Sequence, residues 1–288
     1  MTWCFGYNHD EAIACFEKVI GHDDGCALAH FGIAYAVGPN YNRPWILFDP
    51  AAKAQALARA FDESRAALAM KDKLLPAERA LVEALPSRYP AREPIEDQSG
   101  WDRDFADAMR EVYKRHPDDL NVRAFFAEAI MNLTPWKMWD LATGSVAEGA
   151  GTAEARDVLE TALADIPAAW DHPGILHLYV HLIEMSPFPE RALRAGDRLR
   201  ELVPDSGHLI HMPTHLDVQC GHYADVLHWN QKAIEADRKF LEREGPMNFY
   251  SAYRIHNYHF AIYGGMFLGQ YAPALAAAEE LIDTMPEA

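Results

Sequence analysis

Apolar residues recur at steps of three and four along most of this chain, within segments that are rich in alanine. That period places them on one face of an α-helix, whereas a half-buried strand requires strict alternation. Stretches rich in proline and glycine, such as GPNYNRP and REGPMN, separate the segments and predict turns. The pattern therefore predicts an all-α protein built from antiparallel helical hairpins. The clearest helical segments are DEAIACFEKVI (10–20), PAAKAQALARAFDESRAALAM (50–70), PAERALVEALPSRY (76–89), AEARDVLETALADI (153–166) and YAPALAAAEELID (271–283).

Composition narrows the class of protein further. Of the 288 residues, 50% are hydrophobic and 24% are charged, which is typical of a globular chain with a sizeable core. The net charge of -17 disfavours nucleic acid and anionic membranes as partners. No run of about eighteen apolar residues occurs, and the first residues, MTWCFGYNHD, lack the features of a signal peptide. The four cysteines form no C-x-x-C pair, so we expect reduced thiols and a cytoplasmic location.

The helical segments also repeat with a fixed period. The segment PERALRAGDRLRELVPD begins at position 189 and its counterpart YADVLHWNQKAIEADRK begins at 223, so the two are 34 residues apart. A final copy, QYAPALAAAEELIDTMP, follows after a longer connection. Periods of about 20 to 50 residues indicate a solenoid in which each unit packs on its neighbours.

On these residues the sequence resembles the tetratricopeptide repeat family, whose unit is a 34-residue helical hairpin. The resemblance is carried by a small residue, an aromatic residue and an alanine at the hairpin turn, in GHYADV (221–226), GQYAPA (269–274), DFADA (104–108) and NHDEA (8–12). The segment HFGIAYAVG (30–38) is similar to the family's first helix. The resemblance implies one right-handed superhelical solenoid over residues 1–288, with about five and a half repeats.

Several units depart from the regular repeat. Insertions enlarge the loops between paired helices at GPNYNRPWILFD, PAREPIEDQSGW and TPWKMWDLATGSVAEGAGT. The chain also begins within a first helix and stops soon after a second one, although repeat arrays need polar terminal caps. We therefore expect either a piece of a longer protein or a homo-oligomer that forms through the uncapped ends.

Histidines are concentrated in the repeats from 171 to 288, at spacings of three and four residues. Such spacings place side chains on one helix face. The family resemblance implies that the first helix of each hairpin lines a concave groove, and counting back from each turn places these residues on the groove side. The stripes comprise His177, His181 and Glu184, then His208, His211 and His215, then His256 and His259, with Tyr263 farther along the last helix.

The number of imidazoles favours a metal site over a neutral polar groove. Helices that pack about 8–10 Å apart allow facing stripes to reach one ion held about 2.0–2.1 Å from each nitrogen. We therefore predict that the seven histidines and Glu184 bind one or two transition metal ions. Imidazole ligands without a nearby cysteine suit copper, zinc or iron. Glu184 is predicted to ligate, to act as a general base, or to orient a histidine, and Tyr263 to act as an acid or to anchor substrate.

Two classes of function follow. The first is a metalloenzyme that acts on a small molecule in the groove by metal-dependent oxidation or hydrolysis. The second is a non-catalytic repeat scaffold whose histidines contact a peptide or protein partner, because this fold serves many unrelated functions. A metal-sensing or metal-carrying protein is a third alternative.

Overall fold

The computed structural model describes residues 1–285, and within this range the chain is helical. The β-structure in this range is limited to two isolated bridges, Asn40 with Arg43 and Trp139 with Val146. The predicted all-α class is confirmed. The last three residues of the predicted solenoid, 286–288, lie outside the described residues. Within residues 1–285, none of the helices has both the length and the apolar character needed to cross a membrane.

The chain divides into two compact units. Residues 1–4 and 8–169 form the first unit, and residues 5–7 join the chain from Trp170 onward in the second. The second unit begins next to Asp171, where the predicted metal-site repeats begin. The arrangement of the repeats as one continuous solenoid stays a prediction.

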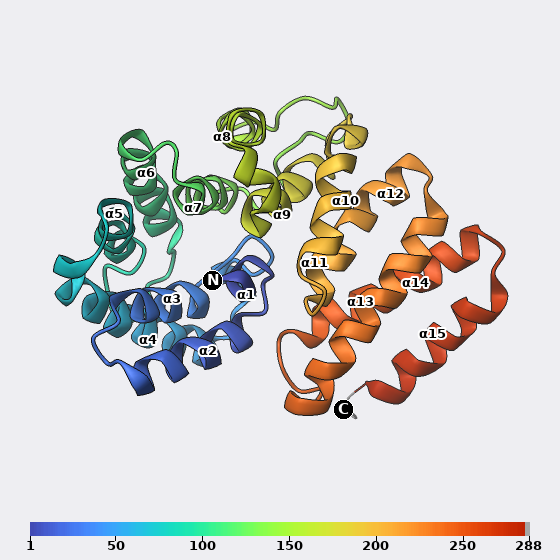
Figure 1. Ribbon diagram of the computed structural model, residues 1–288, viewed down its shortest axis with the longest axis horizontal. Coiled ribbons are helices and arrows are strands. Elements are labelled where there is room, and N and C mark those ends of the chain that lie inside the picture. The colour runs from blue at the N-terminus through green and yellow to red at the C-terminus, as the bar shows by residue number, and fades with distance from the viewer. Residues whose placement is uncertain (286–288) are drawn as a thin grey trace. The chain divides into compact units, whose positions relative to one another are not determined.

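The first unit consists of successive helices and three short 3-10 turns, coloured blue to green in Figure 1. Neighbouring pairs such as α2 with α3, α3 with α4, and α7 with α8 are in contact. The predicted insertions form the irregular connections after α3, before α6 and after α7. The helices are α1 (Thr2–Phe5), α2 (His9–His22), α3 (Ala27–Val37), α4 (Pro50–Ala69), α5 (Pro76–Ala84), α6 (Ser99–Arg115), α7 (Leu120–Met131) and α8 (Thr152–Asp165), and the turns are Trp45–Leu47, Lys71–Lys73 and Leu85–Ser87.

The second unit continues the pattern of paired helices, coloured olive to red in Figure 1. Helices α13, α14 and α15 lie side by side around a core of Ile234, Tyr258, Ala261, Ala277 and Leu281. The turn at Pro167–Asp171 spans the boundary between the two units. The elements that follow it are α9 (Pro173–Ile183), a turn at Pro189–Ala192, α10 (Leu193–Leu202), α11 (Gly207–His211), α12 (Pro213–Cys220), α13 (Tyr223–Glu244), α14 (Ser251–Phe267) and α15 (Tyr271–Thr284).

Helix α9 is buried on all sides, from Gly174 to Ile183. A helix that is apolar all round belongs in a protein interior, and PGILHLYVHLI has this character apart from its two histidines. Those histidines are therefore carried into the interior by the helix. His172 caps the helix start, because its Nδ1 accepts a hydrogen bond from the Ile175 N–H at 3.2 Å.

The stripe of His208, His211 and His215 crosses a break between α11 and α12. Pro213 has no backbone N–H, so the regular ladder of hydrogen bonds is interrupted there. Met212 nevertheless keeps helical angles, with φ -51° and ψ -41°. The side chains on either side of the break therefore keep the one-face arrangement that the spacing predicts.

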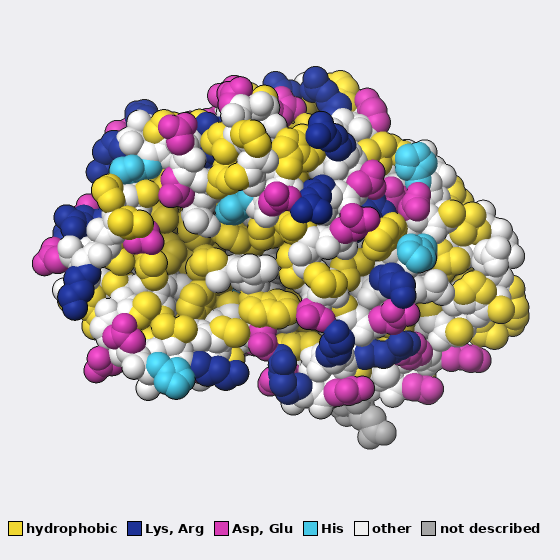
Figure 2. Space-filling model, in the orientation of Figure 1, with side chains coloured by type: hydrophobic (Ala, Val, Ile, Leu, Met, Phe, Trp, Pro, Cys, Tyr) yellow, Lys and Arg dark blue, Asp and Glu magenta, His cyan; other side chains and the backbone are white. Residues whose placement is uncertain are grey.

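The surface carries mixed charge on the face shown in Figure 2. Lys and Arg side chains alternate with Asp and Glu side chains over this face, and the histidines visible on it are isolated from one another. The clustered histidines described below are mostly buried.

The packing of α3 on α2 gives a test of the fold. A Cβ added at Gly32 would lie 2.3 Å from two ring carbons of Phe16. We expect Gly32→Ala to lower the free energy of unfolding by roughly 1–3 kcal/mol, because overpacking outweighs the better helix propensity of alanine. Gly21 in α2 has no atom within 4 Å of the corresponding position. Gly21→Ala should therefore leave stability unchanged or raise it by up to about 1 kcal/mol. Equal stability of the two variants in urea titrations would contradict this packing.

Candidate metal centre

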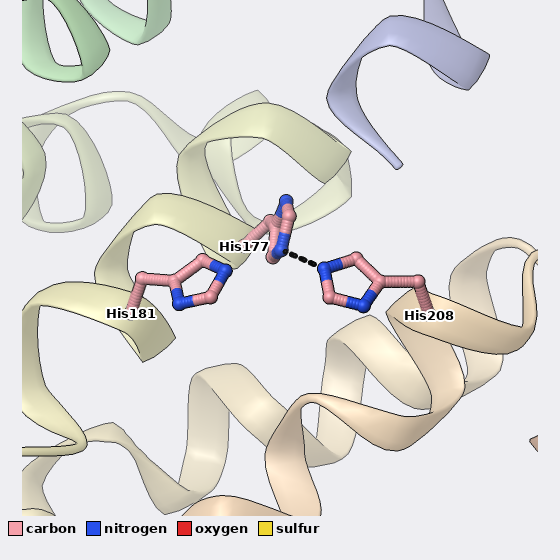
Figure 3. Close-up of side chains that lie close together, drawn as sticks. All are labelled: His177, His181 and His208. Carbon is pink, nitrogen blue, oxygen red and sulfur yellow. Dashed lines mark hydrogen bonds between the residues drawn. The ribbon is translucent and has the colours of Figure 1, made fainter. Parts of the chain in front are cut away.

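Three histidines from α9 and α11 form a buried group, which we call the inner triad: His177, His181 and His208. Each side chain offers a ring nitrogen, and the three nitrogens lie within 4.8 Å of one another. Figure 3 shows the three rings turned toward a common point. All three residues are at most 3% exposed, so the inner triad is closed to solvent.

Hydrogen bonds fix which nitrogens of the inner triad carry protons. His177 Nδ1 lies 2.6 Å from the Phe5 carbonyl oxygen, which can only accept, so Nδ1 carries the proton and donates. His181 Nδ1 lies 2.8 Å from Glu184 Oε1 and likewise donates. Their Nε2 atoms therefore bear lone pairs. His177 Nε2 lies 3.1 Å from His208 Nε2.

A second group, the outer triad, consists of His211 on α11, His215 on α12 and His256 on α14. Its ligand nitrogens also lie within 4.8 Å of one another. His215 Nε2 lies 2.9 Å from His211 Nε2 and 3.2 Å from His256 Nε2. His211 is fully buried, whereas His215 and His256 are partly exposed. This group is therefore accessible from solvent on one side.

Asn230 determines the tautomer of His211. The amide nitrogen of Asn230 donates to Val226 O at 2.7 Å and to Thr214 Oγ1 at 3.0 Å, so its oxygen Oδ1 faces His211. That oxygen accepts from His211 Nδ1 at 2.7 Å. The Nδ1 of His215 donates in the same way to Glu184 Oε2, at 2.7 Å. In its neutral form, each of these two histidines therefore presents an unprotonated Nε2 to the site.

With both rings neutral, the 2.9 Å contact between His211 Nε2 and His215 Nε2 therefore joins two lone pairs. Such a contact is unfavourable unless a cation lies beside both nitrogens, either an added proton or a metal ion. Burial lowers the pKa of His211 well below its usual value, and the neighbouring His215 and His256 lower it further, so a proton on His211 Nε2 is disfavoured. Nitrogens that share one tetrahedral ion at about 2.0–2.1 Å lie about 3.3–3.4 Å apart, close to the spacings found here. The outer triad thus fits a metal ion.

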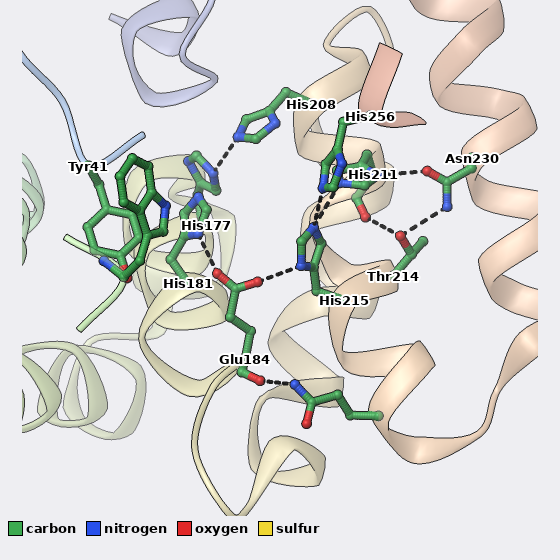
Figure 4. A network of polar contacts seen from close by, with 12 residues as sticks. Tyr41, His177, His181, Glu184, His208, His211, Thr214, His215, Asn230 and His256 are labelled. Atoms are coloured by element: carbon green, nitrogen blue, oxygen red, sulfur yellow. Dashed lines mark hydrogen bonds and ion pairs between the residues drawn. The ribbon is translucent and has the colours of Figure 1, made fainter. Parts of the chain in front are cut away.

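Glu184 links the two triads through its carboxylate. Figure 4 shows the side chain between His181 and His215, with one oxygen directed to each. Burial alone would raise the pKa of this carboxyl, but the two histidines outweigh that effect and hold the pKa well below its usual range. The side chain of Gln219 also donates to the Glu184 backbone carbonyl. Glu184 is therefore held ionised and in one orientation.

His177, His208 and His256 are also held in the neutral form, which is the form that binds metals. Burial lowers the pKa of His177 and His208 well below the usual value, and neighbouring imidazoles add to this effect. Burial, followed by the effect of His215, lowers the pKa of His256 to about 4. A protein interior that keeps clustered imidazoles unprotonated near neutral pH provides lone pairs for coordination.

Aromatic rings surround both triads. The ring centroid of Tyr7 lies 4.7 Å from that of His177 and 5.6 Å from that of His208, and Tyr7 has a positive φ of 54°. Non-glycine residues seldom adopt this left-handed conformation, and such residues concentrate at functional sites. The ring centroid of Phe260 on α14 lies 4.6 Å from that of His215 and 4.7 Å from that of His256. These rings form the apolar walls of the site.

The structure thus brings together most of the residues predicted from the sequence. Two lie apart from both triads. His259 is exposed and belongs to neither group. Tyr263 is 40% exposed, and its ring packs against Tyr223 and Phe267. Seven residues along α14 separate it from His256, which is about 10 Å along the helix axis. The predicted roles of His259 and Tyr263 remain predictions.

Sequence reasoning did not identify Tyr7, Asn230 or Phe260 as members of the site. Phe260 lies four residues after His256, so the helical spacing would have placed it on the same face. Tyr7 and Asn230 reach the histidines only through tertiary packing, and no local pattern indicates them.

A further group that could hold an ion consists of Asp217, His222 and Asp225. Asp217 is already paired with Arg200, at 3.1 Å. His222 and Asp225 are exposed. This group is a poorer metal site than either triad, because Arg200 already neutralises the buried carboxylate of Asp217.

Comparison of the sequence with models of known protein families gives no match, and comparison with curated proteins also gives none.

The Asn230 side chain gives a direct test of this geometry. Asn230→Ala removes the acceptor of the His211 Nδ1–H and leaves a buried donor unpaired. We expect metal affinity to fall by about 10- to 100-fold, the usual effect of losing an outer-shell partner. Gln231→Ala, an exposed neighbour on the same helix, should retain wild-type affinity. Competition titrations with a chromophoric chelator measure both. If Asn230→Ala binds metal with unchanged affinity, Asn230 does not set the His211 tautomer that binds the metal.

Proposed function

We propose that this protein is a metalloenzyme that binds a transition metal ion at the outer triad and acts on a small molecule there. The observation that carries the proposal is the 2.9 Å approach of His211 Nε2 and His215 Nε2, both with their Nδ1 protons committed elsewhere. A bound cation resolves this contact, whereas a groove that binds peptide backbone gains nothing from it.

The ligand set indicates which ions are suitable. Three neutral imidazoles without a sulfur ligand suit copper, zinc or iron. Three protein ligands also leave coordination positions open, as in catalytic sites rather than closed structural ones. When bound, such an ion supplies Lewis acidity or redox chemistry to a substrate.

The surroundings of the outer triad support access by a small molecule. His215 and His256 are partly exposed, whereas His211 and Asn230 are buried and hold the site from behind. The ring of Phe260 contacts all three histidines of the triad and provides an apolar surface beside them. A substrate with an apolar portion fits this side of the site.

Of the two reaction classes, the site supports oxidation better than hydrolysis. Hydrolysis at a metal ion requires a general base whose pKa lies near the working pH. The pKa of Glu184 is held far below that range, and both of its oxygens accept hydrogen bonds from histidines. Glu184 therefore serves to position His181 and His215 rather than to remove a proton from water.

We also propose that the fold is a solenoid of tetratricopeptide-like hairpins. In the second unit α9 contacts α10, α12 contacts α13, and α14 contacts α15, which supports the pairing expected from the 34-residue period. In this arrangement α9, α11, α12 and α14 are the first helices of their hairpins, and they carry both triads.

Metal analysis tests the proposal directly. Full-length protein without a polyhistidine tag is expressed in medium supplemented with copper, zinc and iron. The amount of each metal per chain is then measured by mass spectrometry. We expect at least about one equivalent of a single transition metal per chain. A content below about 0.2 equivalents for every transition metal, in folded protein, would rule out the metalloenzyme and favour a peptide-binding scaffold.

A pair of variants locates the ion. His211→Ala removes one ligand of the outer triad and should abolish binding there, whereas His228→Ala changes an exposed histidine of α13 and should not. Equal metal contents of the two variants, at equal stability, would show that the outer triad is not the binding site.

A further inference from the structure

We propose that the inner triad holds a second metal ion, which is closed to solvent and separate from the ion of the outer triad. This inference rests on the proposed metal binding at the outer triad. It adds a division of roles: the inner ion stabilises the unit, and the outer ion faces the substrate.

Two histidines of the inner triad direct unprotonated nitrogens toward the third. His177 donates through Nδ1 to the Phe5 carbonyl and His181 donates through Nδ1 to Glu184, so both Nε2 atoms are unprotonated. These nitrogens and a nitrogen of His208 lie within 4.8 Å of one another. Two buried lone pairs therefore converge on the third imidazole, which carries a single proton in its neutral form.

A direct hydrogen bond between two of these imidazoles is the alternative to a bound ion. His208 Nε2 could donate its proton to His177 Nε2 across the 3.1 Å contact. That hydrogen bond joins only two of the three rings. One ion can accept lone pairs from all three rings, and a distance of about 2.0–2.1 Å to each nitrogen is compatible with the 3.1 Å separation of His177 Nε2 and His208 Nε2.

A single carboxylate separates the two triads. The carboxylate of Glu184 lies between them and accepts one N–H from each, from His181 and from His215. Glu184 thus orients one histidine of each triad by accepting the hydrogen bond from its Nδ1–H. Histidines that ligate metals usually donate their other N–H to a carboxylate or carbonyl in this way. One negative charge placed between the two sites also reduces the repulsion between two cations.

The difference in burial sets the difference in role. Every residue of the inner triad is at most 3% exposed, and the ring of Tyr7 packs against all three imidazoles. Exchange of an inner ion requires local opening of the unit. The outer ion, beside the partly exposed His215 and His256, exchanges without it.

Stoichiometry and release kinetics test the inference together. Full-length protein is loaded with Zn²⁺, freed of excess metal, and mixed with an excess of a chromophoric chelator. We expect two equivalents of Zn²⁺ per chain, one released rapidly and one at least about tenfold more slowly. His211→Ala should retain only the slow equivalent, His177→Ala only the fast one, and His228→Ala both. Circular dichroism establishes that each variant is folded, and His208→Gln replaces His177→Ala if the latter does not fold.

The outcomes separate this inference from the proposed function. If wild-type protein releases a single equivalent of Zn²⁺ rapidly, and folded His177→Ala releases the same amount at the same rate, the outer site stands and the inner site is overturned. Release of two equivalents at one common rate would overturn the closed character of the inner site. Loss of both equivalents from either folded variant would show a single shared cluster. Absence of any bound Zn²⁺ in wild-type protein would refute both proposals.

Discussion

The buried carboxylate of Glu184 is the interaction on which the histidine cluster depends. Placing an ionised carboxylate in a protein interior is costly unless it is paired and hydrogen-bonded. Here both oxygens accept N–H groups, from His181 at 2.8 Å and from His215 at 2.7 Å. Because a histidine that donates through Nδ1 must present Nε2 as its lone pair, one carboxylate fixes the orientation of a ligand in each triad.

The same logic extends through the rest of the site. The carbonyl of Phe5 and the amide oxygen of Asn230 commit the Nδ1 protons of His177 and His211. Four imidazoles thus have assigned tautomers, determined by three acceptor residues: Glu184 for His181 and His215, Phe5 for His177 and Asn230 for His211. The helices place these acceptors rigidly, because α9 is buried on all sides and α13 packs along α14. A site prepared in this way requires little reorganisation when an ion binds.

The sequence predicted the helical class and most of the cluster because both depend on local spacing. His177 and His181 are four residues apart, and so are His211 and His215, so each pair lies on one face of helical backbone. The break at Pro213 does not disturb this relation, because Met212 remains helical. The 34-residue period further predicted that stripes from successive repeats would meet.

The remainder depends on tertiary packing and could not be predicted in the same way. Sequence spacing alone did not separate the histidines into two triads, because His208 and His211 share α11 but belong to different groups. The contribution of Asn230 requires α13 to lie against α11 and α12. Tyr7 joins the site through a backbone conformation with φ of 54°, which no helical pattern indicates.

X-ray absorption spectroscopy of the metal-loaded protein tests the central claim most directly, because it reports the atoms bound to the ion. Coordination by the histidine triads predicts a first shell dominated by imidazole nitrogens at about 2.0–2.1 Å, with the outer-shell scattering that imidazole rings produce. A first shell of carboxylate oxygens alone, or one containing sulfur at about 2.3 Å, would contradict the account, because neither triad includes a carboxylate or a cysteine as a ligand.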